Sequence, residues 1–418
     1  MIRFDKFPIG FWACFPPGFQ WTKEEVARWK DCGLTLAMTP YYAPGRTDKA
    51  AFLAAMDACA EAGISLIIFD ERSLVSTYKK DPENYRKVYQ EAVNDFGSHP
   101  ATAGFFIGDE PYGEAIIPCQ EVCKIQREIA PNLIPYVNFL PYDGLKDCGY
   151  NTQGKTFNQW IDDFASESDC STFSYDCYVQ MNPEKDWIHN FYANLFNYTK
   201  AAKRNDKFLF CIALGVGHFR YRVPNIDELR WQFNAAVATG ANGMLWFTFY
   251  NNFRYNNYRG AAIDEFGKET ETYHAMTRLH KRFLRDYGEI INTSKHLDTF
   301  CIGREYGGYG FFRVDIPIAE ETGVLGVQSL HGTPGLLSFF ENEKGEKFLM
   351  VFNNSYESSD RFHLTIDGKV KKIWRLYNNE TVDFEKSHWD AYFVRGKNAV
   401  EAGVWLEPGG FDLFKLEY

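Results

Sequence analysis

The sequence predicts an α/β protein, a (β/α)8 barrel followed by a C-terminal antiparallel β-sandwich. A short apolar run followed by an amphipathic segment recurs eight times before residue 290. The apolar runs are continuous rather than alternating, which is typical of parallel strands covered on both faces. Eight such units fit a closed barrel better than an open doubly wound sheet. No glycine-rich nucleotide fingerprint follows the first run, which also disfavours a dinucleotide-binding fold.

Each barrel strand is expected at one of the apolar runs, and helix signals lie between them. The expected strands are Phe7–Cys14, Leu34–Thr39, Ser65–Asp70, Thr102–Asp109, Ile134–Phe139, Thr172–Tyr178, Phe208–Leu214 and Gly243–Tyr250. Thr22 and Asn225 each begin a capping-box pattern, and Asp81-Pro82 places proline in the first turn of a helix. Gly63 lies where the helix that begins near Asp48 should end.

The pattern changes after the helix expected over Thr270–Ile290. Short alternating runs then appear between turn signals, and they are Tyr309–Val314, Lys347–Phe352, Arg361–Ile366, Lys371–Leu376 and Phe411–Leu416. This pattern predicts antiparallel strands. We therefore expect a barrel over residues 1–294 and a β-sandwich over residues 295–418. The sandwich tryptophans Trp374, Trp389 and Trp405 are expected to pack against the barrel.

Composition narrows the function. Aromatic residues make up 17% of the chain, more than core packing usually requires, and aromatic faces commonly hold sugars. The net charge of −10 argues against nucleic acid as a partner, and no apolar stretch is long enough to cross a membrane. The ten cysteines have no metal-site spacing, so no metal or cofactor is expected. Unpaired cysteines without an export signal suggest the cytoplasm, and a homo-oligomer is possible.

Reactive groups of such a barrel lie at the carboxyl ends of its strands. Besides the pair Asp109-Glu110, the residues expected at this rim are Tyr42, Asp70, Asn138, Asp176, Tyr178, His218, Arg220, Trp246 and Tyr250. Acids, amides and aromatic rings that converge on one rim suit a carbohydrate better than a phosphate or a metal. Several of them also have purely structural interpretations: Asp70 can pair locally with Arg72, Asp176 can be a hydrogen-bonded structural residue, and Trp246 can plug the barrel.

The adjacent carboxylates Asp109 and Glu110 end the fourth apolar run. Like charges at close range repel, which raises one pKa and keeps one carboxyl protonated near neutral pH. Glu110 has the longer side chain and is the better candidate to reach a glycosidic oxygen as general acid. The alternative is that these carboxylates cap the next helix or pair with an arginine.

Glu110-Pro111 resembles the end of strand 4 in the (β/α)8 barrels of glycoside hydrolase clan A, including the family 42 β-galactosidases. In that clan the strand ends in Asn-Glu-Pro, and its Glu is the acid/base. The passage from Arg222 to Phe247 also resembles the helix 7 to strand 8 region of such enzymes. The resemblance covers residues 7 to 290 and implies a glycoside hydrolase that acts on a carbohydrate substrate.

Two departures from the clan pattern concern the mechanism. Asp109 stands where the clan has Asn, and strand 7 lacks the nucleophilic Glu. The Asp-Glu pair is similar instead to the hexosaminidases of families 20 and 123, in which the substrate's acetamido group attacks, the Asp orients it and the Glu protonates the leaving group. Asp176 or Asp70 is a further candidate for the second carboxylate. The alternative to an enzyme is a carbohydrate-binding barrel that has lost catalysis.

Overall fold

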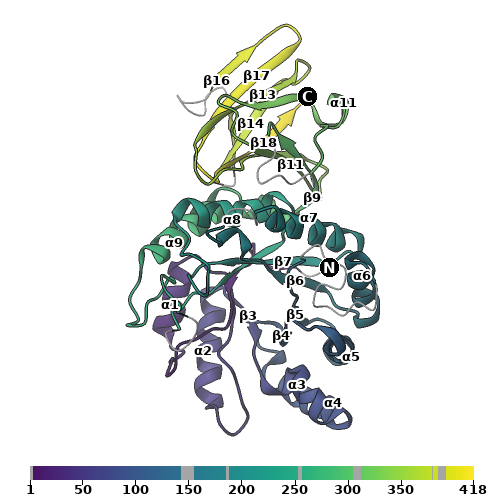
Figure 1. The fold of residues 1–418 in the computed structure, drawn as a ribbon, viewed down its shortest axis with the longest axis vertical. Coiled ribbons are helices and arrows are strands. Elements are labelled where there is room, and N and C mark those ends of the chain that lie inside the picture. Colours follow the sequence, from purple (N-terminus) through teal and green to yellow (C-terminus); the bar gives the residue numbers. More distant parts are fainter. Residues whose placement is uncertain are drawn as a thin grey trace.

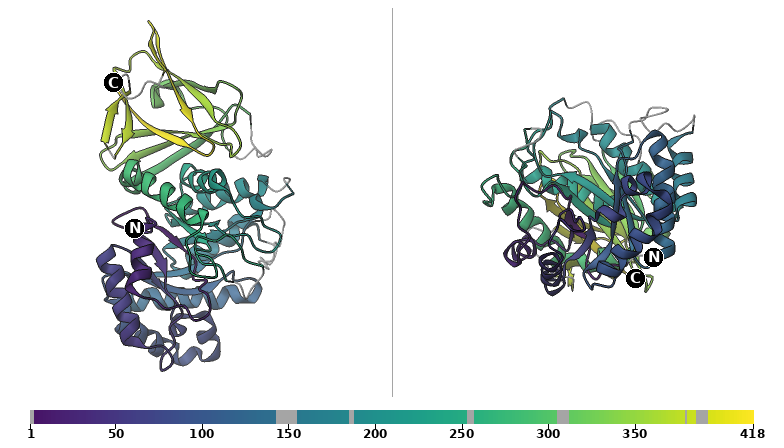
Figure 2. Two further views of the ribbon diagram at one scale, coloured as in Figure 1. Left: turned by 90° about the vertical axis from the view of Figure 1, so that its left-hand side faces the viewer. Right: turned by 90° about the horizontal axis from the view of Figure 1, so that it is seen from below.

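The computed structural model describes residues 3–142, 155–184, 188–252, 257–304, 312–378, 380–384 and 392–418. A barrel forms one end of the molecule and a β-sandwich forms the other (Figures 1 and 2). The fold class is therefore the predicted one.

Eight short parallel strands form the barrel wall. They are β1 (Ile9–Phe11), β2 (Leu36–Met38), β3 (Ser65–Ile68), β4 (Thr102–Asp109), β5 (Ile134–Asn138), β6 (Thr172–Asp176), β7 (Phe208–Leu214) and β8 (Gly243–Phe247). They make two arcs, β2-β3-β4-β5 and β1-β8-β7-β6. Phe139 N donates to Ser174 O at 2.7 Å across the seam between β5 and β6, and Thr35 N donates to Ile9 O at 2.9 Å across the other seam.

Strand register decides which side chains fill the barrel. The interior cluster contains Leu36, Met38, Ile67, Phe106, Ile134, Tyr136, Phe210, Ile212 and Leu245. The alternate residues of the same strands face the surrounding helices. The bounds of β4 and β7 are those expected from the sequence, whereas the other strands are shorter.

Helices cover the outside of the barrel, as Figure 1 shows. They are α1 (Lys23–Asp31), α2 (Lys49–Ala62), α3 (Val75–Lys80), α4 (Pro82–Ala92), α5 (Ile116–Ile129), α6 (Phe157–Ser168), α7 (Ile188–Arg204), α8 (Ile226–Ala238), α9 (Glu271–Asp286) and α10 (Gly288–Thr293). Asn225 makes the full predicted capping box, and Asp81 accepts from Asn84 N just before Pro82. At Thr22 one half of the predicted capping box forms, in which the Thr22 side chain accepts from Glu25 N. Gly63 ends α2 with φ of 72°, a left-handed conformation that glycine adopts without strain.

Two antiparallel sheets form the sandwich. The inner sheet has the order β15-β14-β18-β12-β11-β9 and the outer sheet β10-β13-β17-β16. Their strands are β9 (Ser294–Ile302), β10 (Val324–Ser329), β11 (Gly335–Asn342), β12 (Lys347–Asn353), β13 (Asp360–Asp367), β14 (Lys372–Tyr377), β15 (Glu380–Asp383), β16 (Tyr392–Arg395), β17 (Ala399–Leu406) and β18 (Phe411–Glu417). A short helix, α11 (Ala319–Thr322), precedes β10. Four predicted strands match β12, β13, β14 and β18. Half of the fifth, Tyr309–Val314, lies outside the described residues, and in the other half only Arg313 makes an isolated bridge, to Phe300.

The inner sheet packs on the helices α8, α9 and α10 of the barrel. Leu336, Phe348 and Phe411 of this sheet belong to the same continuous apolar cluster as the barrel helices. Asn354 accepts hydrogen bonds from Trp231 Nε1 at 3.0 Å and Tyr192 Oη at 2.6 Å, both on barrel helices. The sandwich is thus fixed to the side wall of the barrel.

Candidate active site

Three carboxyl groups meet at the carboxyl ends of β4 and β6. Asp109 is the last residue of β4, Glu110 follows it, and Asp176 is the last residue of β6. Asp176 is buried and makes a side-chain hydrogen bond with Glu110. Asp109 is exposed and Glu110 is half-buried, so solvent reaches these two from the mouth of the barrel.

Asn138, at the end of β5, connects the acids. Its Nδ2 donates to Asp176 Oδ1 at 2.8 Å and to Asp109 Oδ1 at 3.1 Å. Its Oδ1 accepts from Ser174 Oγ at 3.1 Å, and Ser174 Oγ lies 2.7 Å from Tyr136 Oη. Because Ser174 uses its proton on Asn138, the Tyr136 hydroxyl donates to Ser174. This chain fixes the amide so that its NH2 group faces both carboxyls.

The backbone of β4 is irregular where it delivers the acids. The register with β5 shifts between Phe106 and Gly108, so that Asp109 lies opposite Asn138. Such bulges re-aim side chains and often occur next to active sites. Glu110 has φ of 43°, an unfavourable conformation for a side chain of its size, while its N–H donates to Asn138 O at 2.9 Å. Strained residues held by surrounding bonds concentrate at functional sites.

The surroundings raise the pKa values of all three acids. Burial raises the pKa of Asp176 well above its ordinary value, and the charges of Glu110 and Asp109 raise it further. Asp109 reaches solvent at the mouth, but the protein atoms around its carboxyl partly desolvate it, which raises its pKa to about 6 against the lowering effect of the Asn138 hydrogen bond. The pKa of Glu110 is raised by burial, and its hydrogen bond with Asp176 opposes that rise. Asp176, which is buried beside two negative charges, is therefore the acid whose charged form is most disfavoured.

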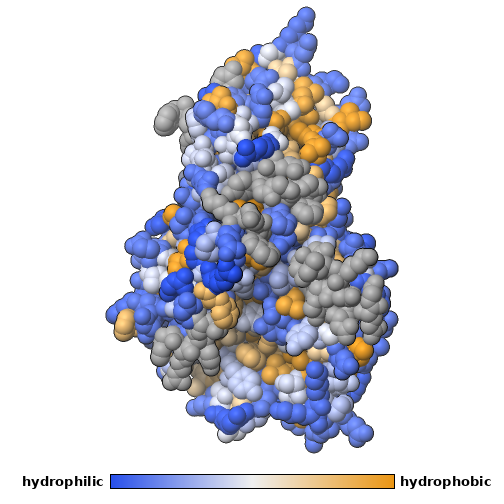
Figure 3. All heavy atoms as spheres, in the orientation of Figure 1, coloured by the Kyte–Doolittle hydropathy of each residue, from blue (hydrophilic) through white to orange (hydrophobic). Residues whose placement is uncertain are grey.

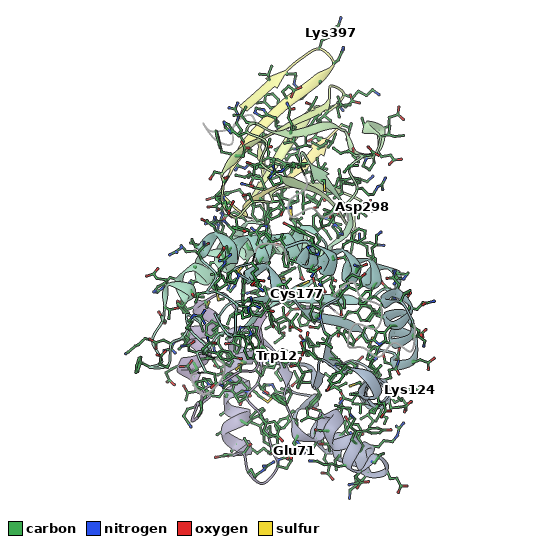
Figure 4. All side chains as sticks on the ribbon, in the orientation of Figure 1. Trp12, Glu71, Lys124, Cys177, Asp298 and Lys397 are labelled. Carbon is green, nitrogen blue, oxygen red and sulfur yellow. The ribbon has the colours of Figure 1, made fainter. Side chains whose placement is uncertain are left out.

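Aromatic rings flank the acids. Tyr178 stacks on Phe247 with ring centroids 5.3 Å apart, and both rings are half-buried. Burial raises the pKa of Tyr178, and the nearby charges of Asp176, Asp109 and Glu110 raise it further. Half-buried Trp12, at the end of β1, contacts Phe106 edge-on at 5.3 Å. Figure 4 places Trp12 and Cys177, the residue after Asp176, near the centre of the barrel, where Figure 3 shows a hollow in the surface.

Two aromatic residues expected at the mouth face the helices instead. Trp246 is 0% exposed, and its Nε1 donates to His280 Nε2 of α9 at 2.9 Å. Tyr250 is buried, accepts from Trp29 Nε1 at 2.5 Å and donates to Glu25 Oε2 at 2.9 Å. The prediction that these two side chains bind a sugar is corrected by their position. The inward neighbour of Trp246 is Phe247.

Tyr42 and Asp70 are structural as well, which corrects their assignment to substrate binding. Tyr42 is buried against Phe52 and Phe96. Asp70 is fully buried and accepts from Arg72 Nε at 3.0 Å and Nη2 at 2.7 Å. Asp70 therefore forms the local ion pair with Arg72 that was its structural interpretation. This pairing leaves Asp70 unavailable as a second catalytic carboxylate.

His218 and Arg220 follow β7 and have different surroundings. The buried His218 ring packs edge-on against Tyr178 and stacks with Tyr258. Burial lowers its pKa to about 4, so the ring is neutral at physiological pH. Arg220 is largely exposed and pairs with Glu184 on the surface. The structure therefore places His218 among the rings of Tyr178 and Tyr258, whereas Arg220 lies on the surface.

The sequence interpretation did not select Phe247 or Trp12 as binding residues. Successive residues of a strand face opposite sides, so Phe247 and Trp246 cannot both point into the barrel. The sequence does not show which of them does, because both faces of a barrel strand are apolar. Among the described residues, no helix is long and apolar enough to span a membrane. The described residues also contain no group of three or more His, Cys, Asp and Glu side chains that could hold a metal ion.

No protein-family model matches the sequence, and no curated protein matches it. Solved structures do. A catalytic mutant of a family 42 β-galactosidase from G. stearothermophilus superimposes with a TM-score of 0.64 at 8% identity, covering 99% of this chain and 98% of that one. A family 39 glycoside hydrolase from the gut symbiont Bacteroides cellulosilyticus WH2 gives a TM-score of 0.54 at 10% identity, covering 98% and 81%.

A β-galactosidase from the psychrophilic Marinomonas ef1 gives a TM-score of 0.51 at 11% identity, and the match covers 66% of this chain and 59% of that chain. At such identities the similarity concerns the fold. The chain thus shares its fold, a (β/α)8 barrel with an added β-sandwich, with solved glycoside hydrolases.

Proposed function

We propose that the protein is a glycoside hydrolase in which Glu110 is the general acid/base. The observation that supports this most directly is the trio of Asp109, Glu110 and Asp176, held by the Asn138 amide at the mouth of the barrel. Environments that push the pKa values of neighbouring carboxyls apart are typical of acid–base sites. The half-buried rings of Tyr178, Phe247 and Trp12 supply apolar faces for a sugar.

In the proposed reaction, Glu110 delivers the proton. Asp176 is buried behind it and hydrogen-bonded to it, while Glu110 is accessible from the mouth. As the glycosidic C–O bond breaks, the Glu110 proton passes to the leaving oxygen and a nucleophile bonds to the anomeric carbon. Glu110 then accepts a proton from the incoming water.

We propose that the nucleophile is the substrate's own acetamido oxygen. No carboxylate occurs between Phe208 and Arg220, and Asp70 is bound to Arg72. The carboxyls of a retaining pair are about 5 Å apart, with the sugar between them, and those of an inverting pair are farther apart. Asp176 is hydrogen-bonded directly to Glu110, which suits a proton-sharing partner better than a nucleophile on the opposite face. Exposed Asp109 is then the group that orients the acetamide.

Glu110→Gln tests the proposed function. It should lower kcat on natural glycosides by two or more orders of magnitude, because general acid catalysis contributes about 10² to 10⁴. Thermal melting and a panel of aryl glycosides that includes N-acetylhexosaminides are the measurements. Wild-type turnover by a folded Glu110→Gln variant would contradict the assignment. If the wild type hydrolyses no member of the panel but binds sugars, the carbohydrate-binding alternative is favoured. That alternative is based on the absence of a carboxylate from strand 7.

The nucleophile can be tested separately. Substrate assistance predicts that Asp109→Ala severely impairs hydrolysis of N-acetylhexosaminides and that a thiazoline analogue of the cyclised intermediate inhibits the wild type. Rescue of Asp176→Asn by azide would favour Asp176 as nucleophile instead. Turnover restricted to sugars without a 2-acetamido group would exclude substrate assistance.

We also propose that the protein acts in the cytoplasm. The nine cysteines among the described residues are free thiols. Free thiols persist in reducing compartments, which supports the cytoplasm as the place of action.

A further inference from the structure

The outer sheet of the sandwich has a tryptophan on the face turned away from the barrel. Trp405 of β17 is 44% exposed, although packing against the barrel was expected for it. The inner sheet, not the outer one, contacts the barrel helices (Figure 1). Trp374 lies on β14 of the inner sheet and donates from Nε1 to Glu417 at 2.8 Å, and Trp389 lies outside the described residues.

The surroundings of Trp405 are polar and fixed. The His331 ring lies 6.1 Å from it at an interplanar angle of 32°. His331 is held by the fully buried Asp360, whose carboxylate lies 2.8 Å from Nδ1 and accepts from the His331 N–H at 3.0 Å. Asp360 also accepts from Thr333 N at 3.2 Å. A buried carboxylate therefore sets the position of an imidazole that is 62% exposed beside the indole.

The neighbouring strand extends this surface. Arg361 lies directly opposite Trp405 and donates from Nε to His363 Nε2 at 2.9 Å. His363 lies opposite Gly403, where an added Cβ would come within 3.0 Å of the imidazole Nδ1. The glycine thus leaves the space that the His363 ring occupies on the sheet. Indole, imidazole and guanidinium groups thus lie next to one another on the face of the outer sheet that is turned away from the barrel.

We propose that this surface, Trp405 with His331, Arg361 and His363, binds a carbohydrate chain and is a second sugar site separate from the barrel mouth. A sugar ring combines an apolar C–H face, which an exposed indole can cover, with hydroxyl groups around its edge. The imidazoles and the guanidinium place polar groups at the edge of the indole. The net charge of −10 disfavours nucleic acid.

Binding can be measured without catalysis. The full chain with Glu110→Gln is run by affinity electrophoresis in gels that contain soluble β-galactan, β-mannan or arabinoxylan, and the same chain with added Trp405→Ala is compared. We expect retardation by at least one of the three polysaccharides. In that gel the apparent Kd should rise about tenfold or more on Trp405→Ala, the cost of losing an aromatic platform. Trp374→Ala is the matched control, since its indole is tied to Glu417, and should leave retardation unchanged.

Arg361→Ala is the second variant, and it should weaken the same binding to a smaller extent while the indole stays in place. Hydrolysis of small aryl glycosides by Trp405→Ala in the otherwise wild-type chain should be unchanged, because the surface is remote from the mouth. The proposal is overturned if none of the polysaccharides retards the protein, or if Trp405→Ala and Trp374→Ala are retarded equally. Neither result depends on whether Glu110 is catalytic, so failure here and failure of the proposed function are distinguishable.

Discussion

Asp176 occupies an environment in which a protonated carboxyl and a carboxamide are nearly equivalent. It accepts from Asn138 Nδ2 and hydrogen-bonds to Glu110. An asparagine at this position can accept through its oxygen and donate through its NH2 group to the same partners. It cannot, however, release a proton to Glu110.

We therefore predict that Asp176→Asn folds with wild-type thermal stability but loses activity, with a changed alkaline limb of the pH–rate profile. Asp176→Ala should be less stable, because Asn138 loses an acceptor inside the protein. Thermal melts and kcat/KM from pH 4 to 9 are the measurements. Equal stability of the two variants would contradict the hydrogen-bonding roles assigned to Asp176.

The raised pKa of Asp109 makes the stability of the folded protein depend on pH. The folded protein binds a proton at Asp109 up to about pH 6, whereas an unfolded chain loses it near pH 4. The folded state therefore becomes less stable, relative to the unfolded state, as pH rises through this window. Asp109→Asn removes the ionisation, so its Tm should match the wild type at pH 4 and exceed it at pH 7 to 8.

The control for this prediction is Asp31→Asn. Asp31 is an exposed carboxylate with a pKa lowered by its hydrogen bond to Lys281, so its contribution to stability has the opposite sign. Its substitution should give no gain that grows with pH. A gain of the same size in both variants would indicate a general charge effect on this acidic chain rather than the local desolvation of the Asp109 carboxyl.

At the scale of elements, the site depends on the seam between β5 and β6. Ser174 connects the strands twice, through its carbonyl to Phe139 N and through its hydroxyl to Asn138 Oδ1. Ser174→Ala should lower the free energy of unfolding by about 1–2 kcal/mol, the cost of a buried acceptor without its donor. It should also lower kcat, since the Asn138 amide is no longer oriented. Tyr136→Phe retains the Ser174–Asn138 bond and should affect kcat less, and urea unfolding with parallel kinetics distinguishes the two effects.

How far the sequence predicts the molecule also differs between elements. β4 and β7 are long continuous apolar runs, and their bounds are predicted correctly. The acids and Asn138 are predicted because polar residues at the end of a buried strand stand out. Trp246 and Tyr250 are assigned to the wrong side because apolar residues cover both faces of β8 and the residues after it, so composition does not show which face lines the barrel. The Asp176–Glu110 hydrogen bond depends on strand neighbours far apart in sequence, which no local pattern encodes.

At the scale of the whole molecule, the sandwich and the barrel share an interior. Asn354 is the acceptor for both Trp231 and Tyr192 at their boundary. We predict that Asn354→Ala lowers the free energy of unfolding by about 2–4 kcal/mol, because two buried donors lose this acceptor. Differential scanning calorimetry should show one shifted transition, since the continuous apolar cluster couples both parts. A wild-type Tm for Asn354→Ala would contradict the role of this contact.

The pairing of β1 with β8 has a consequence for synthesis on the ribosome. β1 ends at Phe11, and its parallel partner β8 begins at Gly243. At about 5–20 residues per second, roughly 10–50 s separate the emergence of the two strands. During that time an apolar strand has an unpaired edge in the nascent chain, which is a surface that chaperones bind. Slower translation anywhere between codons 12 and 243 should therefore prolong this exposure, whereas slower translation of the last hundred codons should not.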